Sequence, residues 1–426
     1  MTIHVVKPGD TVFRIARQYD VPMQRVITDN ELHEPARLTP GQTLVIQFPK
    51  KVYTVQQGDT LGDIAAKTGT TVYQLWQNNP QLGGNDRIYP GQQLVISYDG
   101  TKKGAFAVNG YAYPNIDLGV LRKTLPYLTY LSVFSFGVQP DGSITYIDDK
   151  NLPEAAREFG AVPLMVLTTL APDGTFSGER ASQLLHDPAA QQRLVQELLA
   201  YMEQRGYGGV DVDFEYLPPA DRDLYAEFIA MLRRELGQHG HIVLVALAPK
   251  TSPEQRGLLY EAHDYAKLGQ AADYSLIMTY EWGYSRSAPM AVAPINKVRQ
   301  VVQYAASAIP PDRILMGIPN YGYDWTLPFV QGESVARSLG NVQAVEQAIN
   351  EGASIEFDQT AQSPFYNYYR DRKEHEVWFE DARSIQSKLA LAREFGLHGV
   401  SIWNIMRYFP QLWLVLNSEF AIQKTK

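Results

Sequence analysis

The feature that most constrains the fold is a regular alternation of apolar and amphipathic segments that begins near residue 105. Eight apolar runs have the length and composition of strands, at residues 106–113, 127–138, 162–170, 209–217, 242–249, 274–282, 314–321 and 399–406. Amphipathic stretches fit between them, and those at 191–205, 221–236 and 382–395 carry apolar residues at helical spacing. This alternation predicts βα units around a parallel sheet. Eight such units predict an α/β fold, the (β/α)8 TIM barrel.

The seventh and eighth runs are too far apart for a simple connection. Roughly 75 residues, rich in tyrosine and in charge, lie between them, which is longer than an ordinary loop. We therefore expect an α+β insertion subdomain near residues 324–380.

The fourth run places three acidic residues on one face. Side chains alternate along a strand, so Asp211, Asp213 and Glu215 point one way and the apolar residues between them point the other. Carboxylates two residues apart lie roughly 7 Å from each other. Burial and mutual repulsion must raise at least one pKa, so that protons are shared along the row. A carboxyl that stays protonated near neutral pH can act as a general acid.

Aromatic residues are expected at the same end of the barrel as these acids. Barrel enzymes carry their chemistry at the carboxyl ends of the strands. Glu215 ends the strand expected in the fourth run, and six aromatic residues lie at or just beyond the ends of the sixth, seventh and eighth strands: Trp282, Tyr284, Tyr321, Tyr323, Trp325 and Trp403. Any single aromatic residue belongs more often to the core than to a ligand site, but several of them beside acids at one end of the barrel favour a carbohydrate substrate.

The first hundred residues contain a repeat. His4–Thr11 (HVVKPGDT) matches Tyr53–Thr60 (YTVQQGDT), and Pro40-Gly41-Gln42 matches Pro90-Gly91-Gln92. Each copy predicts a strand, a Gly-Asp-Thr turn that caps a helix, a second short helix ending near Asn30 or Asn79, and a last strand. A polar, glycine-bearing linker at 98–104 separates the repeat from the long domain.

Composition excludes several classes of function. The net charge of -8 argues against nucleic acid and anionic lipid as partners. The absence of cysteine excludes disulfides and thiolate metal sites, and the eight histidines show no metal-binding spacing, so neither metal nor cofactor is expected. No apolar run reaches the length of a membrane span, and the N-terminus lacks the pattern of a general secretion signal.

Both repeats resemble the LysM module. The shared pattern Gly-Asp-Thr, Asn and Pro-Gly-Gln carries this resemblance over nearly the full length of each copy, expected at 1–48 and 51–98. The resemblance implies a βααβ fold that binds N-acetylglucosamine polymers such as peptidoglycan or chitin. It also implies a sugar site between the Gly-Asp-Thr turn and the Pro-Gly-Gln loop, formed by Gly9, Asp10, Thr11 and Pro40 and by Gly58, Asp59, Thr60 and Pro90.

The long domain, expected at 104–426, resembles family 18 glycoside hydrolases. Gly209–Glu215 (GVDVDFE) matches the acidic signature of that family, and Met278-Thr279-Tyr280 and Trp403 match further positions. The resemblance implies that Glu215 protonates the glycosidic oxygen. Asp213 would orient the substrate's 2-acetamido group while sharing a proton with Asp211, and Tyr280 would hydrogen-bond the acetamido carbonyl. Expected substrate contacts are Trp403, the floor of the subsite, and Trp282, Tyr321 and Tyr113.

Two LysM modules before such a barrel resemble the N-acetylglucosaminidases that degrade spore cortex. We therefore expect a peptidoglycan hydrolase associated with the spore coat, cortex or cell wall, without a secretion signal and without a membrane partner. Because Asp213 shares a strand and a face with Glu215, it is poorly placed as a nucleophile, which favours attack by the substrate's own acetamido oxygen. The alternatives are a chitinase and an inactive sugar-binding lectin or coat protein. Thr168-Thr169 and Glu281 depart from the usual chitinase pattern and favour a substrate other than chitin.

Overall fold

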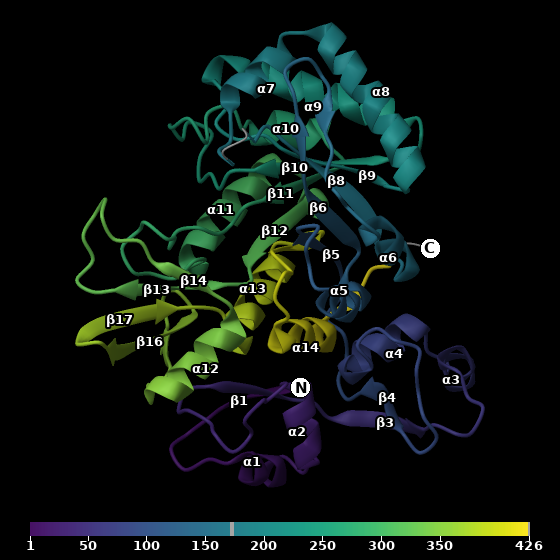
Figure 1. The fold of residues 1–426 in the computed structure, drawn as a ribbon, viewed down its shortest axis with the longest axis vertical. Coiled ribbons are helices and arrows are strands. Elements are labelled where there is room, and N and C mark those ends of the chain that lie inside the picture. The colour runs from purple at the N-terminus through teal and green to yellow at the C-terminus, as the bar shows by residue number, and fades with distance from the viewer. Residues whose placement is uncertain (171–173, 425–426) are drawn as a thin grey trace.

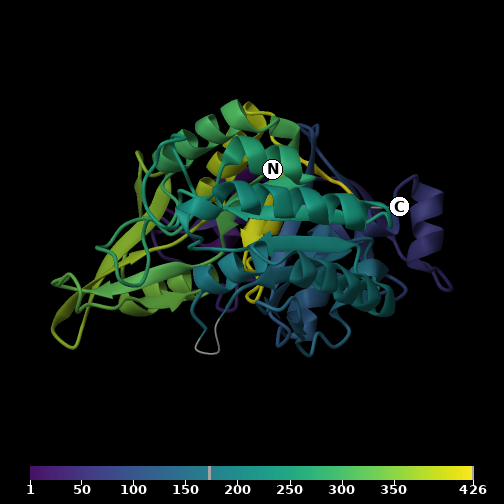
Figure 2. The same cartoon turned by 90° about the horizontal axis from the view of Figure 1, so that it is seen from above.

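The computed structural model describes residues 1–170 and 174–424, which form a barrel domain with an inserted sheet and two small N-terminal modules (Figure 1). The modules lie next to one another at one side of the barrel domain, at the bottom of Figure 1. Seen from above, the inserted sheet and the second module lie at opposite ends of the molecule (Figure 2). None of the described helices combines the length and the apolar composition needed to cross a membrane.

Each N-terminal module has the expected βααβ order. The first contains β1 (Thr2–Val5), α1 (Val12–Gln18), α2 (Met23–Asp29) and β2 (Thr43–Ile46). The second contains β3 (Pro49–Thr54), α3 (Leu61–Thr68), α4 (Val72–Asn78), the short 3-10 helix η1 (Pro80–Leu82) and β4 (Gln93–Tyr98). In both, the two strands pair antiparallel.

The repeated polar residues explain why both copies fold alike. The hydroxyls of Thr11 and Thr60 accept the backbone N–H groups of Arg14 and Asp63 and so cap the first helix. Asn79 is fully buried, and its amide bonds Leu75 and both backbone groups of Val95 at 2.8 to 2.9 Å. Asn30 bonds α2 and β2 in the same way. This asparagine ties the second helix to the last strand, since a buried amide must find partners.

Eight parallel strands close into a barrel, as predicted. They are β5 (Ala105–Ala112), β6 (Tyr130–Val138), β8 (Val162–Thr168), β9 (Gly209–Asp213), β10 (Ile242–Leu247), β11 (Tyr274–Ile277), β12 (Ile314–Pro319) and β18 (Gly399–Trp403). Each pairs with the next in this order, and β18 pairs with β5 to complete the ring. Two short strands, β7 (Ile144–Thr145) and β19 (Ala421–Ile422), flank it.

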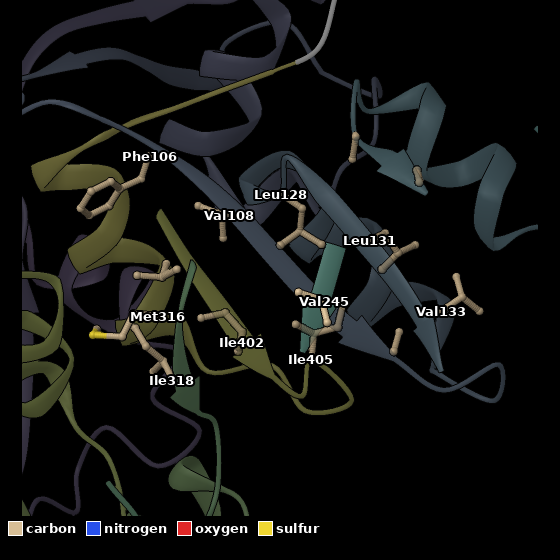
Figure 3. Close-up of a cluster of buried hydrophobic side chains, with 14 of the residues drawn as sticks. Phe106, Val108, Leu128, Leu131, Val133, Val245, Met316, Ile318, Ile402 and Ile405 are labelled. Carbon is tan, nitrogen blue, oxygen red and sulfur yellow. The ribbon is translucent and has the colours of Figure 1, made fainter. Parts of the chain in front are cut away.

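Helices surround the barrel and cover the apolar outer faces of its strands. They are α5 (Leu118–Thr124), α6 (Leu152–Glu158), α7 (Gly178–Leu185), α8 (Pro188–Arg205), α9 (Arg222–Gly237), α10 (Tyr265–Ala271), α11 (Ile295–Ala308), α13 (Ala382–Glu394) and α14 (Pro410–Glu419), with 3-10 turns η2 (Leu125–Tyr127), η3 (Pro219–Asp221) and η4 (Pro311–Arg313). Figure 3 shows part of this core, where Val108, Val133, Val245 and Ile402 come from four different strands. A smaller apolar cluster that includes Tyr111, Leu164 and Leu244 fills the barrel interior.

The predicted insertion follows β12 and forms a five-stranded antiparallel sheet with one helix. Its elements are β13 (Gly322–Thr326), β14 (Arg337–Leu339), α12 (Asn341–Glu351), β15 (Glu356–Asp358), β16 (Ser363–Arg370) and β17 (Lys373–Trp378). It has its own apolar core, which includes Leu339, Tyr366 and Val377. Because β13 begins directly after the carboxyl end of β12, the sheet stands beside that end of the barrel.

Candidate active site

The acidic row lies inside the carboxyl end of the barrel. Asp211 and Asp213 are on β9 and are 0% and 6% exposed. Glu215 follows two residues beyond the strand, which ends at Asp213 rather than at Glu215 as the run of residues had suggested. Val210, Val212 and Phe214 point outward into the core beneath the helices. The alternation predicted for this stretch therefore places all three carboxyl groups on one side.

Asp211 is anchored from the neighbouring strands. Its Oδ2 accepts the Ser132 hydroxyl at 2.9 Å, and that hydroxyl also lies 3.0 Å from Oδ1 of Asn109. The Asn109 amide donates in turn to Ser401 at 3.0 Å. Burial raises the pKa of Asp211 to about 6, against the opposing effect of the Tyr111 and Ser132 hydroxyls. Single polar residues in apolar strands were the available signal for this network, which the sequence analysis missed.

The pKa values of Asp213 and Glu215 are shifted still further than that of Asp211. Burial raises the pKa of Asp213 well above its usual value, and repulsion from Glu215 and Asp211 raises it further. Burial likewise raises the pKa of Glu215 to about 7. Oδ1 of Asp213 is buried and has no hydrogen-bond partner among the described residues. The row therefore carries protons at neutral pH, and Glu215 can hold one for delivery to a leaving group.

Tyr280 faces the same carboxyls from the end of β11. The negative charges of Asp213, Glu215 and Asp211 reinforce burial in raising the pKa of its hydroxyl, so that it remains a donor. The chain turns sharply after Glu215 and after Tyr280, because the residues that follow them, Tyr216 and Glu281, adopt left-handed backbone angles with φ of 57° and 67°. Such turns at non-glycine residues are a frequent mark of functional sites.

Glu281 is held by the insertion. Tyr321 and Tyr323 donate their hydroxyls to its Oε1, the latter at 3.2 Å. Burial raises the pKa of Glu281, and these two hydrogen bonds act against the shift. Tyr321, an expected substrate contact, thus has its hydroxyl engaged with a carboxylate, while the ring remains beside the cleft.

Trp403 is surrounded by aromatic rings at the end of β18. Its ring centroid lies 5.2 Å from that of Tyr111, 5.1 Å from Phe134 and 6.2 Å from Tyr113. Tyr113 is 36% exposed; burial raises the pKa of its hydroxyl, and the nearby charge of Asp213 raises it further, so this ring lies close to the acidic row. Trp403 and Tyr113 therefore belong to one wall of the site. Phe134, which the sequence analysis did not single out, packs behind them.

Two neighbouring cavities meet at Glu281. One, of about 250 Å³, is lined by Trp403, Tyr321, Tyr323 and Arg407 among others. The second, of about 370 Å³, is lined by Tyr280, Trp282, Tyr260 and Lys297 among others. Glu281 lines both, so the two cavities adjoin at this residue near the carboxyl end of the barrel. Trp282 lines the second cavity, whereas Tyr321 and Trp403 line the first.

One aromatic residue at these strand ends is not available to a ligand. Trp325 is 1% exposed, and its indole N–H donates to the carbonyl of Ser287 at 2.7 Å. It is a core residue of the insertion. Within the described residues there is also no cluster of acidic or histidine side chains with the geometry of a metal site.

The residues expected to bind sugar in the two modules lie in equivalent turns. Gly9 and Gly58 have φ of 85° and 86°, as a left-handed turn requires. Asp10 and Asp59 each accept a backbone N–H within the turn at 2.8 Å, so both carboxylates shape the loop. Thr11 and Thr60 cap helices. Pro90 is exposed, whereas Pro40 lies against the insertion.

This combination of a parallel barrel, a buried acidic row and aromatic residues at the strand ends is typical of a glycoside hydrolase. The chain belongs to the glycosyl hydrolases family 18, whose model matches residues 112–407, and residues 4–47 and 53–97 match the LysM domain.

Among the relatives, the cortical fragment-lytic enzyme of Bacillus subtilis is 40% identical over 432 residues, covering 100% of this chain and 99% of that protein. The crystal structure of the Bacillus megaterium spore cortex-lytic enzyme SleL matches with a TM-score of 0.84 at 36% identity, covering 100% and 99% of the two chains. A chitinase from Chromobacterium violaceum matches with a TM-score of 0.66 at 25% identity, over 74% of this chain and 98% of that one.

Proposed function

We propose that this chain is a peptidoglycan hydrolase of the spore cortex, an N-acetylglucosaminidase that retains configuration and is anchored by its LysM modules. The observation that carries the proposal is a carboxyl, Glu215, whose pKa is raised to about 7 at the end of the strand that holds Asp213 and Asp211. A carboxyl half-protonated at neutral pH is suited to protonate a glycosidic oxygen. Tyr280, which faces this row, is suited to hold a polar group of the sugar.

The nucleophile is the carbonyl oxygen of the substrate's 2-acetamido group. A conventional retaining glycosidase needs a second carboxylate across the sugar from the acid, roughly 5 Å away. Asp213 lies on the same strand and face as Glu215, and burial raises its pKa well above the usual value, so it is better suited to position the acetamido group than to attack. The acetamido oxygen attacks the anomeric carbon as the glycosidic bond breaks, and Glu215 gives its proton to the departing oxygen. Water then opens the oxazolinium ion, and Glu215 recovers a proton.

Glu281 is a further carboxylate near the acidic row and lines both cavities, and it has no covalent role in this mechanism. Hydrogen bonds from Tyr321 and Tyr323 hold its Oε1. We therefore expect Glu281→Gln to change substrate affinity while hydrolysis still retains configuration, as followed by NMR of the newly formed anomer. Inversion of configuration, or complete loss of turnover, would assign Glu281 a part in the chemistry.

Spore cortex is the favoured substrate because the relatives named for cortex lysis align over the whole chain, modules included. The chitinase covers 74% of the chain. Association with the cortex or cell wall follows from the same proposal. An inactive lectin is disfavoured by the presence of both Asp213 and Glu215.

Mass spectrometry of the products from purified cortex peptidoglycan tests the proposal, with Glu215→Gln as the control. Fragments that end in reducing N-acetylglucosamine, absent with the control, are expected. Soluble oligomers from chitin with none from cortex would move the assignment to a chitinase. No product from either polymer would favour a sugar-binding protein.

A further inference from the structure

The two LysM modules share a sequence pattern but are docked on the barrel domain by different faces. The first module uses its Pro-Gly-Gln loop. The backbone N–H of Ile355 donates to the Pro40 carbonyl at 2.8 Å, and the Thr39 hydroxyl donates to the Ala353 carbonyl at 2.6 Å. Arg383 donates to the Gly41 carbonyl at 3.2 Å. This loop is thus covered by the segment that leads into β15 and by the start of α13.

The contact at Gly41 is too close for any side chain. A β-carbon added there would collide with the carbonyl oxygen of Ile355. Further along, the side-chain amide of Gln411 on α14 bonds both the hydroxyl and the carbonyl of Thr43, at 2.7 and 2.5 Å. The first module therefore connects the insertion to the barrel helices, and Figure 1 shows it below α12 and α14.

The second module is docked by its second helix instead. The Trp76 ring on α4 lies 4.8 Å from that of Phe159, and Gln77 bonds the Pro126 carbonyl at 2.8 Å and the Tyr127 hydroxyl at 2.9 Å. Its Pro-Gly-Gln loop stays free. A β-carbon added to Gly91 would meet no atom within 4 Å, and the same is true of Gly58 in the facing turn.

One pair of aligned residues separates the modules chemically. Position 39 of the first module corresponds to position 89 of the second, directly before Pro-Gly-Gln. Thr39 is buried and its hydroxyl bonds the insertion, whereas Tyr89 is 60% exposed on the open loop. The loop and turn adjoin each other, because Gly91 and Gln92 pair with Val55 directly before the turn. An exposed aromatic ring beside an open loop is suited to stack on a sugar ring.

We propose that the two modules have different functions. The first holds the insertion against the barrel domain, and the second alone binds the wall glycan, with a sugar ring stacked on Tyr89. This inference rests on the proposed function, since it takes the glycan to be peptidoglycan. It predicts that avidity from two modules is absent and that a single site anchors the enzyme.

Binding to insoluble peptidoglycan tests the glycan site. The full chain carrying Glu215→Gln serves as the parent, so that the polymer is not digested. Tyr89→Ala is expected to weaken binding by about fivefold or more, as for loss of an aromatic anchor. The matched variant is Phe13→Ala, which removes a ring that is 61% exposed beside the turn of the first module. It should leave the dissociation constant within about twofold.

An equal or larger loss with Phe13→Ala would show that the first module binds glycan, and would overturn the proposed difference between the modules. No loss with Tyr89→Ala, or no binding by the parent, would overturn the glycan site, whereas the proposed catalysis is judged separately by the products released from cortex.

A second pair of variants tests the docking of the first module. Gly41 and Gly91 share the same backbone conformation, with φ of 84° and 86°, so alanine imposes the same backbone strain at both. Only Gly41→Ala must also displace Ile355. We expect a larger fall in melting temperature for Gly41→Ala than for Gly91→Ala, together with faster proteolytic cleavage of the linker near residue 100. Equal falls would show that the first module does not dock in solution.

Discussion

Replacing Glu215, the proposed general acid, with glutamine should make the protein more stable at neutral and alkaline pH while abolishing turnover. Burial raises the pKa of Glu215 from 4.5 to about 7 in the folded protein. The folded state therefore binds this proton more tightly than the unfolded chain does. Below pH 4.5 the carboxyl is protonated in both states and does not change the free energy of unfolding. As pH rises through about 7 it ionises in the folded state, and the destabilisation becomes complete. Glutamine has the same shape and no charge, so Glu215→Gln removes the penalty.

The size of the effect follows from the shift. A difference of 2.5 between the two pKa values corresponds to about 3 kcal/mol once the folded carboxyl has ionised. The same relation gives about 1 kcal/mol at pH 5 and about 3 kcal/mol at pH 8. For a catalytic domain of about 320 residues, the unfolding entropy is roughly 0.7 kcal/mol per kelvin. The melting temperature of Glu215→Gln should thus exceed that of the wild type by about 1 °C at pH 5 and about 4 °C at pH 8.

Scanning calorimetry or dye-monitored melting across this pH range measures the gap. Glu203→Gln on α8, an exposed position, controls for general effects of charge and should show no such trend. A gap that stays constant from pH 5 to pH 8 would refute the reasoning, because it would mean that Glu215 titrates alike in the folded and unfolded states.

Three further predictions concern catalysis. The kcat/KM for a small N-acetylglucosamine substrate should fall as pH rises through about 7, since Glu215 then loses its proton; a flat alkaline limb would contradict its role. Asp213→Asn should lower kcat by about 10² to 10⁴ with little change in fold by circular dichroism, and a near-normal rate would exclude acetamido positioning. Tyr280→Phe should cost about 10² to 10³ in kcat, whereas Tyr284→Phe, 41% exposed on the same loop, should be close to wild type; equal effects would deny Tyr280 a specific hydrogen bond.

The sequence by itself determined the barrel, the modules and the placement of three carboxyl groups on one side of β9. Apolar strands with helical stretches between them leave few other ways to bury both faces of a parallel sheet. Alternation along β9 was enough to place Asp211, Asp213 and Glu215 on one side, because side-chain direction in a strand is a local property. The repeated Gly-Asp-Thr and Pro-Gly-Gln patterns likewise fix two similar turns.

Only the tertiary structure decided which groups meet. The contacts of Asp211 with Ser132, and of Glu281 with Tyr321, join residues 79 and 40 positions apart in the chain. Trp325 looked equivalent to its aromatic neighbours, but packing of the insertion buried it. The two modules carry nearly the same turn sequences, yet one Pro-Gly-Gln loop is covered and the other is open. The exposure of a loop depends on which distant part of the chain packs against it, and this cannot be read from the local sequence pattern.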